Sequence, residues 1–502
     1  MAQTHETAVF SLVDEAASLA FSEDLAVILV KGDCLLLSGD LGVGKTTIAR
    51  GIIRSVLGDL EAEVPSPTFS LVNAYEEGRA AIYHFDLYRL SSVEELEETG
   101  FDDALVDGIT LIEWPDRANG FLPDDAVLLE LTEDGTGRRA VMTANQGFLN
   151  RSRRTTLIRK LLDDAGYEGC RRIFLQGDAS LRSYEKVKLN SKPDAVLMNW
   201  PRQEDGAILK DGKTYSELAH LAQDVGPFVA IGETLRRQNF PAPEIYSSDL
   251  DNGILLLEDF GSETVVVNGG PVPERYEACI DLLARMHLVD WSHSAPINDV
   301  KTHEIPAFDW EIIEIEISLL LEWYAPLIAE KSISDEAAAE YKNIWFNLFK
   351  KLQASEQSLV LRDFHSPNLM WRAAHSGEQQ IGLIDYQDAL IGPSAYDVAS
   401  LCQDARVDVS DELEQSLKSR YCNAREENGS DFDPVIFEEA YAIIAAERGT
   451  RLLGLWPRLK HRDNKPHYMQ HMPRTLDYLS RVMHHSTLKP LSGWYQKNLG
   501  LF

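Results

Sequence analysis

Short apolar runs alternate with amphipathic stretches over the first 150 residues. The β-type runs lie at residues 34–38, 81–87, 108–114 and 126–132, and helical patterns lie at 15–29, 46–57 and 92–100. Strands that alternate with helices in this way are typical of an α/β unit with a largely parallel sheet. We therefore expect an α/β domain at the front of the chain.

The pattern changes close to residue 148. A basic run at 151–160 follows, which we interpret as a solvated linker and helix start. Residues 171–260 are rich in β-type runs around one helix predicted at 215–238, and residues 272–502 are mostly long amphipathic helices with a loop-rich stretch at 358–398. The predicted domains are residues 1–148, 149–262 and 263–502.

Composition supports several folded domains and excludes some functions. The chain has 502 residues, of which 44% are hydrophobic and 25% charged, a globular composition at a length that suits about three domains. It carries 48 Lys and Arg against 80 Asp and Glu, a net charge of −32, and the acidity is strongest at the front. Such a field repels a polyanion such as tRNA, so we expect no strong direct binding of nucleic acid.

The cysteines and the apolar runs bear on the compartment. Five cysteines are scattered along the chain, with no CxxC spacing, so neither a disulfide framework nor a zinc site is indicated. The N-terminus lacks the basic and apolar regions of a signal peptide, and no run approaches the length of a membrane span. We expect a cytoplasmic protein that is not inserted in a membrane.

A phosphate-binding loop is predicted between the first strong β-type run and the next helical pattern. Residues 39–46 match GxxxxGK[ST] in full. In such a loop the backbone N–H groups and the helix N-terminus surround the phosphates, the lysine neutralises the β and γ oxygens, and the hydroxyl ligates Mg²⁺. The predicted ATP-binding residues are Gly39, Asp40, Leu41, Gly42, Val43, Gly44, Lys45, Thr46 and Thr47.

Hydrolysis needs further groups from other strand ends. Asp86 follows one β-type run in HFDLYRL, and Glu113 closes another in LIEWPDR. Each acid is a candidate for holding Mg²⁺ directly or through water, and each is equally well explained as a surface acid. Trp114 is suited either to stacking on a base or to packing.

Four segments in order carry a resemblance. GDLGVGKTT, VPSPTFSLVNAYE, YHFDLYRL and IEWPDR together resemble the TsaE (YjeE) family of small bacterial P-loop ATPases. The resemblance implies an ATPase that joins TsaB and TsaD homologues to make threonylcarbamoyladenosine in tRNA, with ATP and Mg²⁺ as cofactors. It also implies that Lys45 and Thr46 bind the nucleotide and Mg²⁺, that Ser66 to Thr68 form a switch-like loop, and that Asp86, Glu113 and Trp114 line the site.

A second phosphate chemistry is predicted in the loop-rich stretch. In LRDFHSPNLMW and LIDYQD, Asp363 is followed by Asn368 and then by Asp385 at the end of a β-type run. Kinase-type phosphotransferases use this arrangement: Asp363 would take the proton of an acceptor hydroxyl, and Asn368 and Asp385 would hold Mg²⁺. Each residue alone is common in turns, but three at these spacings favour the catalytic interpretation. Asp397 is expected to brace the loop.

Two upstream segments would complete a nucleotide site. Residues 175–189 are interpreted as a glycine-containing hairpin over the phosphates, with Gly177, Ser180 and Arg182 nearest them. Residues 253–261, which include Glu258, would form the hinge strand that reads adenine through its backbone.

These segments together resemble the aminoglycoside phosphotransferase-like superfamily over roughly residues 155–485. GDASLRSY, LLLEDFG, LRDFHSPNLMW and LIDYQDALIGPSAYDVASL look closest to anomeric kinases of cell-wall sugars. That resemblance implies a two-lobed, protein-kinase-like α+β domain that transfers phosphate from ATP to C1 of N-acetylmuramate or N-acetylglucosamine in peptidoglycan recycling. One departure matters: Met198 and Asn199 stand where a kinase has its phosphate-pairing lysine, so Arg182, Lys186 or Lys188 substitutes, or ATP is held without it.

A charge argument bears on the acceptor. Residues 447–474 are basic against the trend of the chain, and a basic wall would attract the lactyl carboxylate of N-acetylmuramate. Arg451 and Arg458 are candidates for contacting the substrate, together with Asp388. The alternative is a solvated helix face or an interdomain contact.

The sequence thus predicts an α/β P-loop NTPase domain followed by a two-lobed, kinase-like α+β domain, and a fused ATPase and amino-sugar kinase. One alternative is a kinase of another small alcohol, such as an aminoglycoside or choline. The other is that one domain is a catalytically idle interaction module, which the absent lysine would favour for the kinase half.

Overall fold

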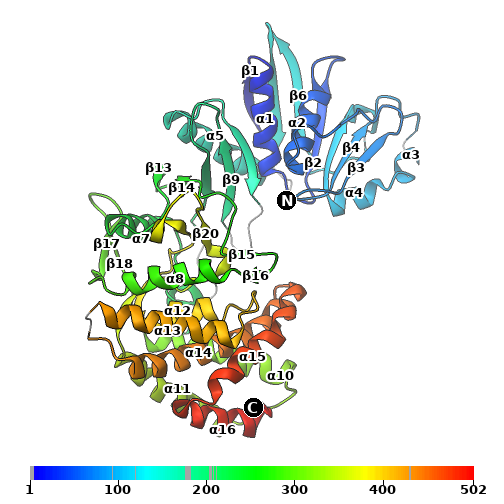
Figure 1. Ribbon diagram of the computed structural model, residues 1–502. Helices are drawn as coiled ribbons and strands as arrows, with labels where there is room; N and C mark the ends of the chain where they lie inside the picture. The colour runs from blue at the N-terminus through cyan, green and yellow to red at the C-terminus, as the bar shows by residue number, and fades with distance from the viewer. Residues whose placement is uncertain are drawn as a thin grey trace. The chain divides into compact units, whose positions relative to one another are not determined.

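The computed structural model describes residues 5–92, 94–118, 120–175, 182–202, 206, 208–210, 212–428 and 431–502. The chain forms two compact units (Figure 1). The first unit combines Met1–Pro201 with Ile245–Asp259, and the second combines Arg202–Glu244 with Phe260–Phe502.

A seven-stranded sheet forms the front of the first unit. Its strands are β1 (Glu6–Leu12), β2 (Cys34–Gly39), β3 (Val72–Tyr75), β4 (Ile82–Asp86), β5 (Ile109–Glu113), β6 (Val127–Asp134) and β7 (Gly137–Ala144), in the order β1-β7-β6-β2-β5-β4-β3. The four central strands β6, β2, β5 and β4 are parallel, and the edges are antiparallel. The predicted α/β domain is confirmed.

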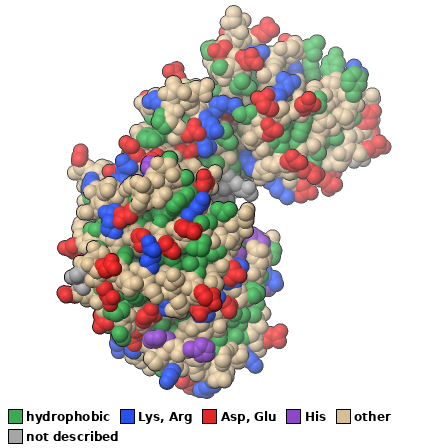
Figure 2. All heavy atoms as spheres, viewed as in Figure 1, with side chains coloured by type: hydrophobic (Ala, Val, Ile, Leu, Met, Phe, Trp, Pro, Cys, Tyr) green, Lys and Arg blue, Asp and Glu red, His purple; other side chains and the backbone are tan. Residues whose placement is uncertain are grey.

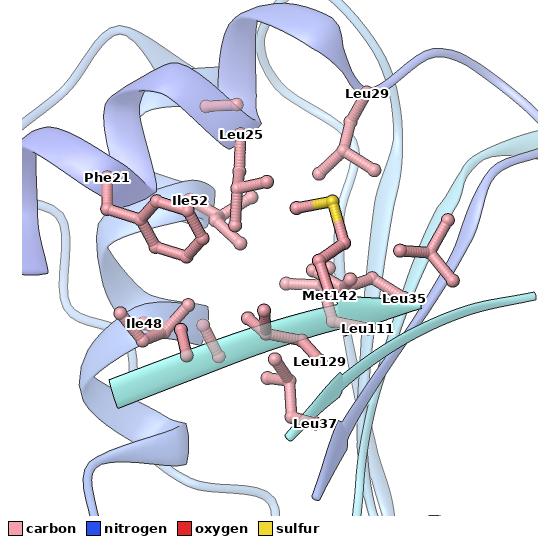
Figure 3. Packing of buried hydrophobic residues seen from close by; sticks show 14 of the residues in the cluster. Phe21, Leu25, Leu29, Leu35, Leu37, Ile48, Ile52, Leu111, Leu129 and Met142 are labelled. Atoms are coloured by element: carbon pink, nitrogen blue, oxygen red, sulfur yellow. The ribbon is translucent and has the colours of Figure 1, made fainter. Parts of the chain in front are cut away.

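Helices cover both faces of this sheet because its parallel strands are apolar on both sides. On one face lie α1 (Glu15–Ile28) and α2 (Lys45–Leu57), whose apolar side chains point at the strands. Figure 3 shows Phe21 and Leu25 of α1, Leu29 directly after it, and Ile48 and Ile52 of α2 facing Leu35, Leu37, Leu111, Leu129 and Met142. The opposite-facing Cys34, Phe85 and Ile112 pack with α3 (Glu94–Glu97) and α4 (Phe101–Asp107). Packing on α1 and the sheet fixes α2, which carries the phosphate loop at its start.

A second, five-stranded sheet completes the first unit. It is antiparallel throughout, in the order β13 (Ile245–Asp249), β14 (Ile254–Glu258), β10 (Ala195–Asn199), β9 (Ser183–Lys188) and β8 (Arg171–Leu175). Helix α5 (Gln146–Asp164), capped by the Asn145 side chain, packs Ile158 and Leu162 against Val187 and Leu197. The boundary predicted at residue 148 therefore lies in the first turn of α5.

Buried charges tie α1 to the five-stranded sheet. The Arg172 side chain is 0% exposed, and its Nε and Nη2 donate to the two carboxylate oxygens of Glu185 at 2.6 and 2.8 Å. Its Nη1 also donates to Asp24 of α1 at 2.5 Å, and Arg159 of α5 donates to the same Asp24 oxygen at 2.8 Å. Since buried charges are tolerated only when they are paired, this cluster fixes how α1 meets β8 and β9.

Replacing Arg172 with Met is expected to lower the free energy of unfolding by about 3–5 kcal/mol, because it leaves the buried Glu185 carboxylate without its partner. Urea unfolding followed by circular dichroism measures the loss. Arg171→Met is the matched control: Arg171 pairs with Glu23 but its side chain is 46% exposed, so the expected loss is below about 1 kcal/mol. Equal losses for the two variants would contradict this account.

The second unit is mainly helical. Its helices are α6 (Tyr215–Leu218), α7 (Gly226–Arg237), α8 (Pro273–Met286), α9 (Trp310–Leu319), α10 (Ala325–Leu327), α11 (Asp335–Gln353), α12 (Ala395–Cys402), α13 (Asp411–Glu427), α14 (Pro434–His461), α15 (Met472–Met483) and α16 (Lys489–Leu499). The long α14 packs against α9, α12 and α15. From the buried middle of this helix, Arg448 donates to the Arg362 carbonyl at 3.3 Å, in the loop-rich stretch that was predicted to carry the second chemistry.

Short antiparallel pairs hold the loops of this unit. They are β11 (Ile208–Lys210) with β12 (Lys213–Thr214), β15 (Val266–Val267) with β16 (Gly270–Pro271), β17 (Ser294–Pro296) with β18 (Thr302–Glu304), β19 (Gln357–Val360) with β22 (Leu390–Pro393), and β20 (Leu369–Trp371) with β21 (Ile381–Leu383). The β19–β22 and β20–β21 pairs frame the loop-rich stretch.

The prediction of one helix over 215–238 is wrong. Helix α6 ends at Leu218, and α7 begins at Gly226 with Pro227 in its first turn, where proline is tolerated, unlike in a helix interior. The backbone of the loop between α6 and α7 forms hydrogen bonds with distant side chains. The Arg362 guanidinium donates to the Ala219 carbonyl at 2.7 Å, and the Ala222 N–H donates to Asp388 at 2.7 Å.

No helix within the described ranges is long and apolar enough to cross a membrane. On the face drawn in Figure 2, acidic side chains are spread widely and basic side chains are interspersed among them.

Candidate active sites

The phosphate loop of the first unit joins β2 to α2. Gly39 has a φ of +138°, and a Cβ there would lie 2.4 Å from the Leu131 carbonyl oxygen. Gly44, at the N-terminus of α2, has a φ of +108°. Glycine is needed at both positions, because side chains are disfavoured at these angles and have no room at Gly39. The predicted strand, loop and helix are therefore all present.

Lys45 lies at the centre of this loop. Its Nζ donates to the carbonyl oxygens of Gly39 and Asp40 at 2.8 and 2.9 Å, and it lies 3.7 Å from the centroid of the Trp114 ring. Burial lowers the pKa of Lys45, and the carboxylates of Glu113 and Asp86 oppose that shift. The ammonium group is thus placed where a loop of this kind binds phosphate oxygens.

The two predicted carboxylates lie at the same edge of the sheet, because β4 and β5 are parallel neighbours. Glu113 closes β5, and its Oε2 accepts from the Thr46 hydroxyl at 2.9 Å. Asp86 closes β4, and its Oδ2 accepts from the hydroxyls of Ser66 and Thr68 at 2.9 and 2.7 Å. The structure therefore brings the loop lysine, the acids and the predicted switch-like loop together.

Magnesium fits this donor set. A hydroxyl and carboxylates are hard oxygen ligands, and Mg²⁺ is commonly held by one or two carboxylates together with substrate phosphates. No group of three or more His, Cys, Asp or Glu side chains in the described part of the chain is arranged to hold a metal ion alone. Thr46 and Glu113 would therefore hold Mg²⁺ jointly with the phosphates.

Sequence reasoning missed two residues at this site. His84 is fully buried, and its Nε2 lies 2.9 Å from Glu113 Oε1, so it orients that carboxylate. The sequence could have indicated His84, because it stands two residues before Asp86 and therefore lies on the same face of β4. Arg138 of β7 donates from Nε to the Val43 carbonyl at 2.5 Å. No spacing in the sequence links it to the loop.

The second centre lies in the second unit. The β20–β21 hairpin pairs Leu369 with Leu383, which brings the residues on either side of it together. Asn368 Nδ2 donates to the Asp363 carbonyl at 3.0 Å and lies 3.5 Å from Asp385 Oδ2. All three predicted residues of the kinase-type arrangement thus converge.

The surroundings of Asp363 favour its charged form. Its Oδ1 lies 3.6 Å from the Nε2 of His365. Burial opposes ionisation, but the His365 imidazole, with help from Arg451 and Arg362, holds the pKa of this carboxyl below its usual range. Asp397 acts as the predicted brace: its two oxygens accept from the backbone N–H groups of Leu361 and Arg362 at 2.7 and 3.0 Å.

The candidate substrate residues lie close to this segment. Arg451 pairs at 3.3 Å with Glu316, a buried acid that also pairs with Arg362 at 3.0 Å. Arg458 lies over the ring of Tyr215, 5.1 Å from its centroid. Asp388 bonds to the loop between α6 and α7. Their contacts with a substrate remain a prediction.

The five-stranded sheet of the first unit carries the predicted nucleotide residues of the kinase half. Gly177 and Ser180 lie outside the described residues. Arg182 lies 4.8 Å from the centroid of the Trp200 ring, and Glu258 is the last residue of β14.

Met198 of β10 is 1% exposed. A buried apolar side chain therefore stands where the resemblance places the kinase lysine. Lys186 is the cross-strand partner of Val196 and so shares the sheet face of Met198. Its Nζ lies 2.8 Å from Asp259 Oδ2. Lys186 remains one of the three candidate substitutes, and its role toward ATP is a prediction.

The first site has the architecture of a P-loop nucleotide-binding domain, and the second has that of a kinase-type phosphotransferase. Residues 12–141 match the family described as threonylcarbamoyl adenosine biosynthesis protein TsaE, and residues 174–432 match the phosphotransferase enzyme family. The chain belongs to both families, as a fusion of a TsaE domain and a phosphotransferase domain. Both are families of ATP-using enzymes.

Curated relatives support each half. The N-acetylmuramate/N-acetylglucosamine kinase of Caulobacter vibrioides is 30% identical over 343 residues, which cover 66% of this chain and 93% of the relative. The Pseudomonas aeruginosa protein of the same name is 30% identical over 265 residues, covering 52% and 74%. The TsaE protein of Haemophilus influenzae is 41% identical over 124 residues, covering 24% and 77%.

Proposed function

We propose that the chain is a bifunctional enzyme. Its kinase half phosphorylates the anomeric hydroxyl of N-acetylmuramate and N-acetylglucosamine with ATP, in peptidoglycan recycling, and its TsaE half is an ATPase that supports threonylcarbamoyladenosine formation in tRNA. The observation that carries the kinase assignment is the convergence of Asp363, Asn368 and Asp385. The names of the relatives supply the acceptor.

In the kinase reaction, Asp363 accepts a hydrogen bond from the C1 hydroxyl and takes its proton. The sugar oxygen forms a bond to the γ-phosphorus as the bond from that phosphorus to the ADP oxygen breaks. Asn368 and Asp385 would hold Mg²⁺, which neutralises the phosphate oxygens when bound. Asp397 keeps the catalytic segment in place through its two backbone hydrogen bonds.

In the ATPase half, Lys45 and the loop N–H groups bind the β and γ phosphates, and Thr46 and Glu113 would hold Mg²⁺. Asp86 accepts hydrogen bonds from Ser66 and Thr68 and so holds their loop beside the phosphate site. In the proposed function this loop responds to the γ-phosphate. The net charge of −32 favours action through TsaB and TsaD homologues over direct contact with tRNA. All five cysteines are free thiols, which agrees with a cytoplasmic location.

The test is a phosphorylation assay on both amino sugars with the full-length chain, in which NMR of the product identifies the phosphorylated carbon. We expect sugar 1-phosphates. Kanamycin and choline are tested in parallel as alternative acceptors. Turnover of kanamycin or choline without turnover of either amino sugar would overturn the assignment.

Lys186→Ala is expected to raise the KM for ATP in sugar phosphorylation about tenfold, because it removes the cation proposed to replace the usual kinase lysine. Initial rates at varied ATP measure the change. The control is Lys188→Ala, since Lys188 is 48% exposed and lies 3.9 Å from Asp194. Equal KM values for the two variants would contradict the role of Lys186.

A further inference from the structure

Arg138 of β7 lies beside the phosphate loop, although no motif of the sequence includes it. It stands two residues before Ala140, which lies with Met142 in the core between the sheet and helices α1 and α2. Since side chains alternate along a strand, Arg138 lies on the face of the sheet that α2 covers. In β6, Leu131 is opposite both Gly39 of β2 and Ala140 of β7. The start of β7 therefore lies at the edge of the sheet where the phosphate loop begins.

The guanidinium of Arg138 lies against one peptide group of this loop. Its Nε donates to the Val43 carbonyl at 2.5 Å, and a Cβ built on Gly44 would lie 2.7 Å from the same Nε. Glu133 is opposite Arg138 in the β6–β7 ladder but is exposed, and no carboxylate among the described residues pairs with Arg138. The partner of this side chain is therefore the loop carbonyl.

This hydrogen bond fixes which way the Val43–Gly44 peptide faces. A peptide group is planar and trans, so its C=O and its N–H point in opposite directions. With the Val43 carbonyl on Arg138, the Gly44 N–H points away from Arg138, and within the described ranges it donates to no protein group. Gly44 directly precedes Lys45 at the N-terminus of α2, where loops of this kind offer their free N–H groups to phosphate oxygens.

The sequence of the loop alone does not fix this orientation. Gly44, which follows the peptide group, has a φ of +108°, and glycine adopts φ values of either sign at similar energy. The peptide can therefore rotate at low steric cost, which would turn the Val43 carbonyl oxygen toward the phosphates and repel them. Because a hydrogen bond from a charged donor is roughly twice as strong as a neutral one, Arg138 is well suited to hold the carbonyl on the opposite side.

We propose that Arg138 is a positioning residue of the phosphate loop, which keeps the Gly44 N–H directed at the phosphates by holding the Val43 carbonyl. It acts through the backbone of the loop and does not touch the transferred phosphate. The inference rests on the proposed ATPase function of the TsaE half and adds a residue that is 95 positions from Val43 in the chain.

Two substitutions separate the hydrogen bond from the charge. Arg138→Met has no donor, whereas Arg138→Gln places an amide nitrogen as many bonds from the backbone as Nε and so keeps a donor without the charge. We expect Arg138→Met to raise the KM for ATP and the Ki for ADP about tenfold, the effect of one lost hydrogen bond. Its kcat should be unchanged, because the ground state and the transition state lose the same contact. Arg138→Gln should keep both constants close to those of the parent chain.

Hydrolysis is measured without sugar in the Asp363→Asn background, so that only the phosphate loop turns over ATP. Arg139→Met is the matched control, because Arg139 is exposed and, as the next residue of β7, lies on the opposite face of the sheet. Inorganic pyrophosphate is a second inhibitor, and its Ki should rise together with that of ADP, because the loop itself is altered. A raised Ki for ADP with an unchanged Ki for pyrophosphate would assign Arg138 to the nucleoside and overturn the proposal.

The remaining outcomes separate this inference from the proposed function. If Arg138→Met leaves KM and Ki unchanged, or if Arg138→Gln is equally impaired, the inference is wrong and the ATPase assignment stands. If the Asp363→Asn chain hydrolyses no ATP, the assignment falls and calorimetry with ADP decides the inference. Weakening of one site by Arg138→Met but not by Arg138→Gln then supports it, and no weakening overturns it. The absence of an ADP site that Lys45→Ala removes overturns both. Thermal unfolding checks that each variant is folded.

Discussion

Replacing Asp363 with Asn is expected to lower kcat for sugar phosphorylation roughly 10²- to 10⁴-fold, the range that a positioned acid or base contributes. The amide retains the shape of the side chain but cannot take the proton of the acceptor hydroxyl. The lowered pKa of this carboxyl means that the wild-type group is charged at neutral pH, so the substitution removes a charge as well as a base. Steady-state rates with saturating ATP and sugar measure the effect.

The same variant should retain hydrolysis of ATP at the phosphate loop, measured without sugar, because none of the contacts of Lys45 involves Asp363. Asp408→Asn is the matched control, since Asp408 is an exposed aspartate of the same unit. Full sugar-kinase activity in Asp363→Asn would exclude this residue as the base.

Replacing Lys45 with Ala is expected to reduce ATP hydrolysis at the phosphate loop roughly 10²- to 10³-fold. This is the usual loss when an enzyme loses one preorganised group that stabilises negative charge in the transition state. Lys45 is 5% exposed and its Nζ lies 3.7 Å from the centroid of the Trp114 ring, so we expect water to replace it poorly. Hydrolysis is measured in the Asp363→Asn background, which silences the kinase centre. Sugar phosphorylation by the single variant should be unchanged.

Calorimetry with a nonhydrolysable ATP analogue gives an independent measurement. The wild-type chain should take up two nucleotides and Lys45→Ala one. Lys31→Ala, which changes a lysine with a 62% exposed side chain, should still take up two. A single nucleotide bound by the wild-type chain would refute the existence of two sites.

The sequence determined the parts of each site that are contiguous. Gly39 to Thr46 form a strand end, a turn and a helix start, so their mutual geometry follows from local backbone rules. Asp363, Asn368 and Asp385 are joined by one short hairpin, so their spacing alone predicted that they converge. The alternation of strands and helices likewise predicted the α/β domain and its parallel central strands, but not the antiparallel pairing at both edges of the sheet.

Only the tertiary structure decided the contacts between distant segments. Arg138 reaches the phosphate loop from 95 residues away, and Arg172 meets Asp24 across 148 residues. The break between α6 and α7, where one helix was predicted, depends in part on Arg362 and Asp388, which bond the loop from far along the chain. Local patterns encode backbone conformation and spacing, whereas the pairing of buried charges and the hydrogen bond from a distant strand to a loop arise only when separate elements pack together.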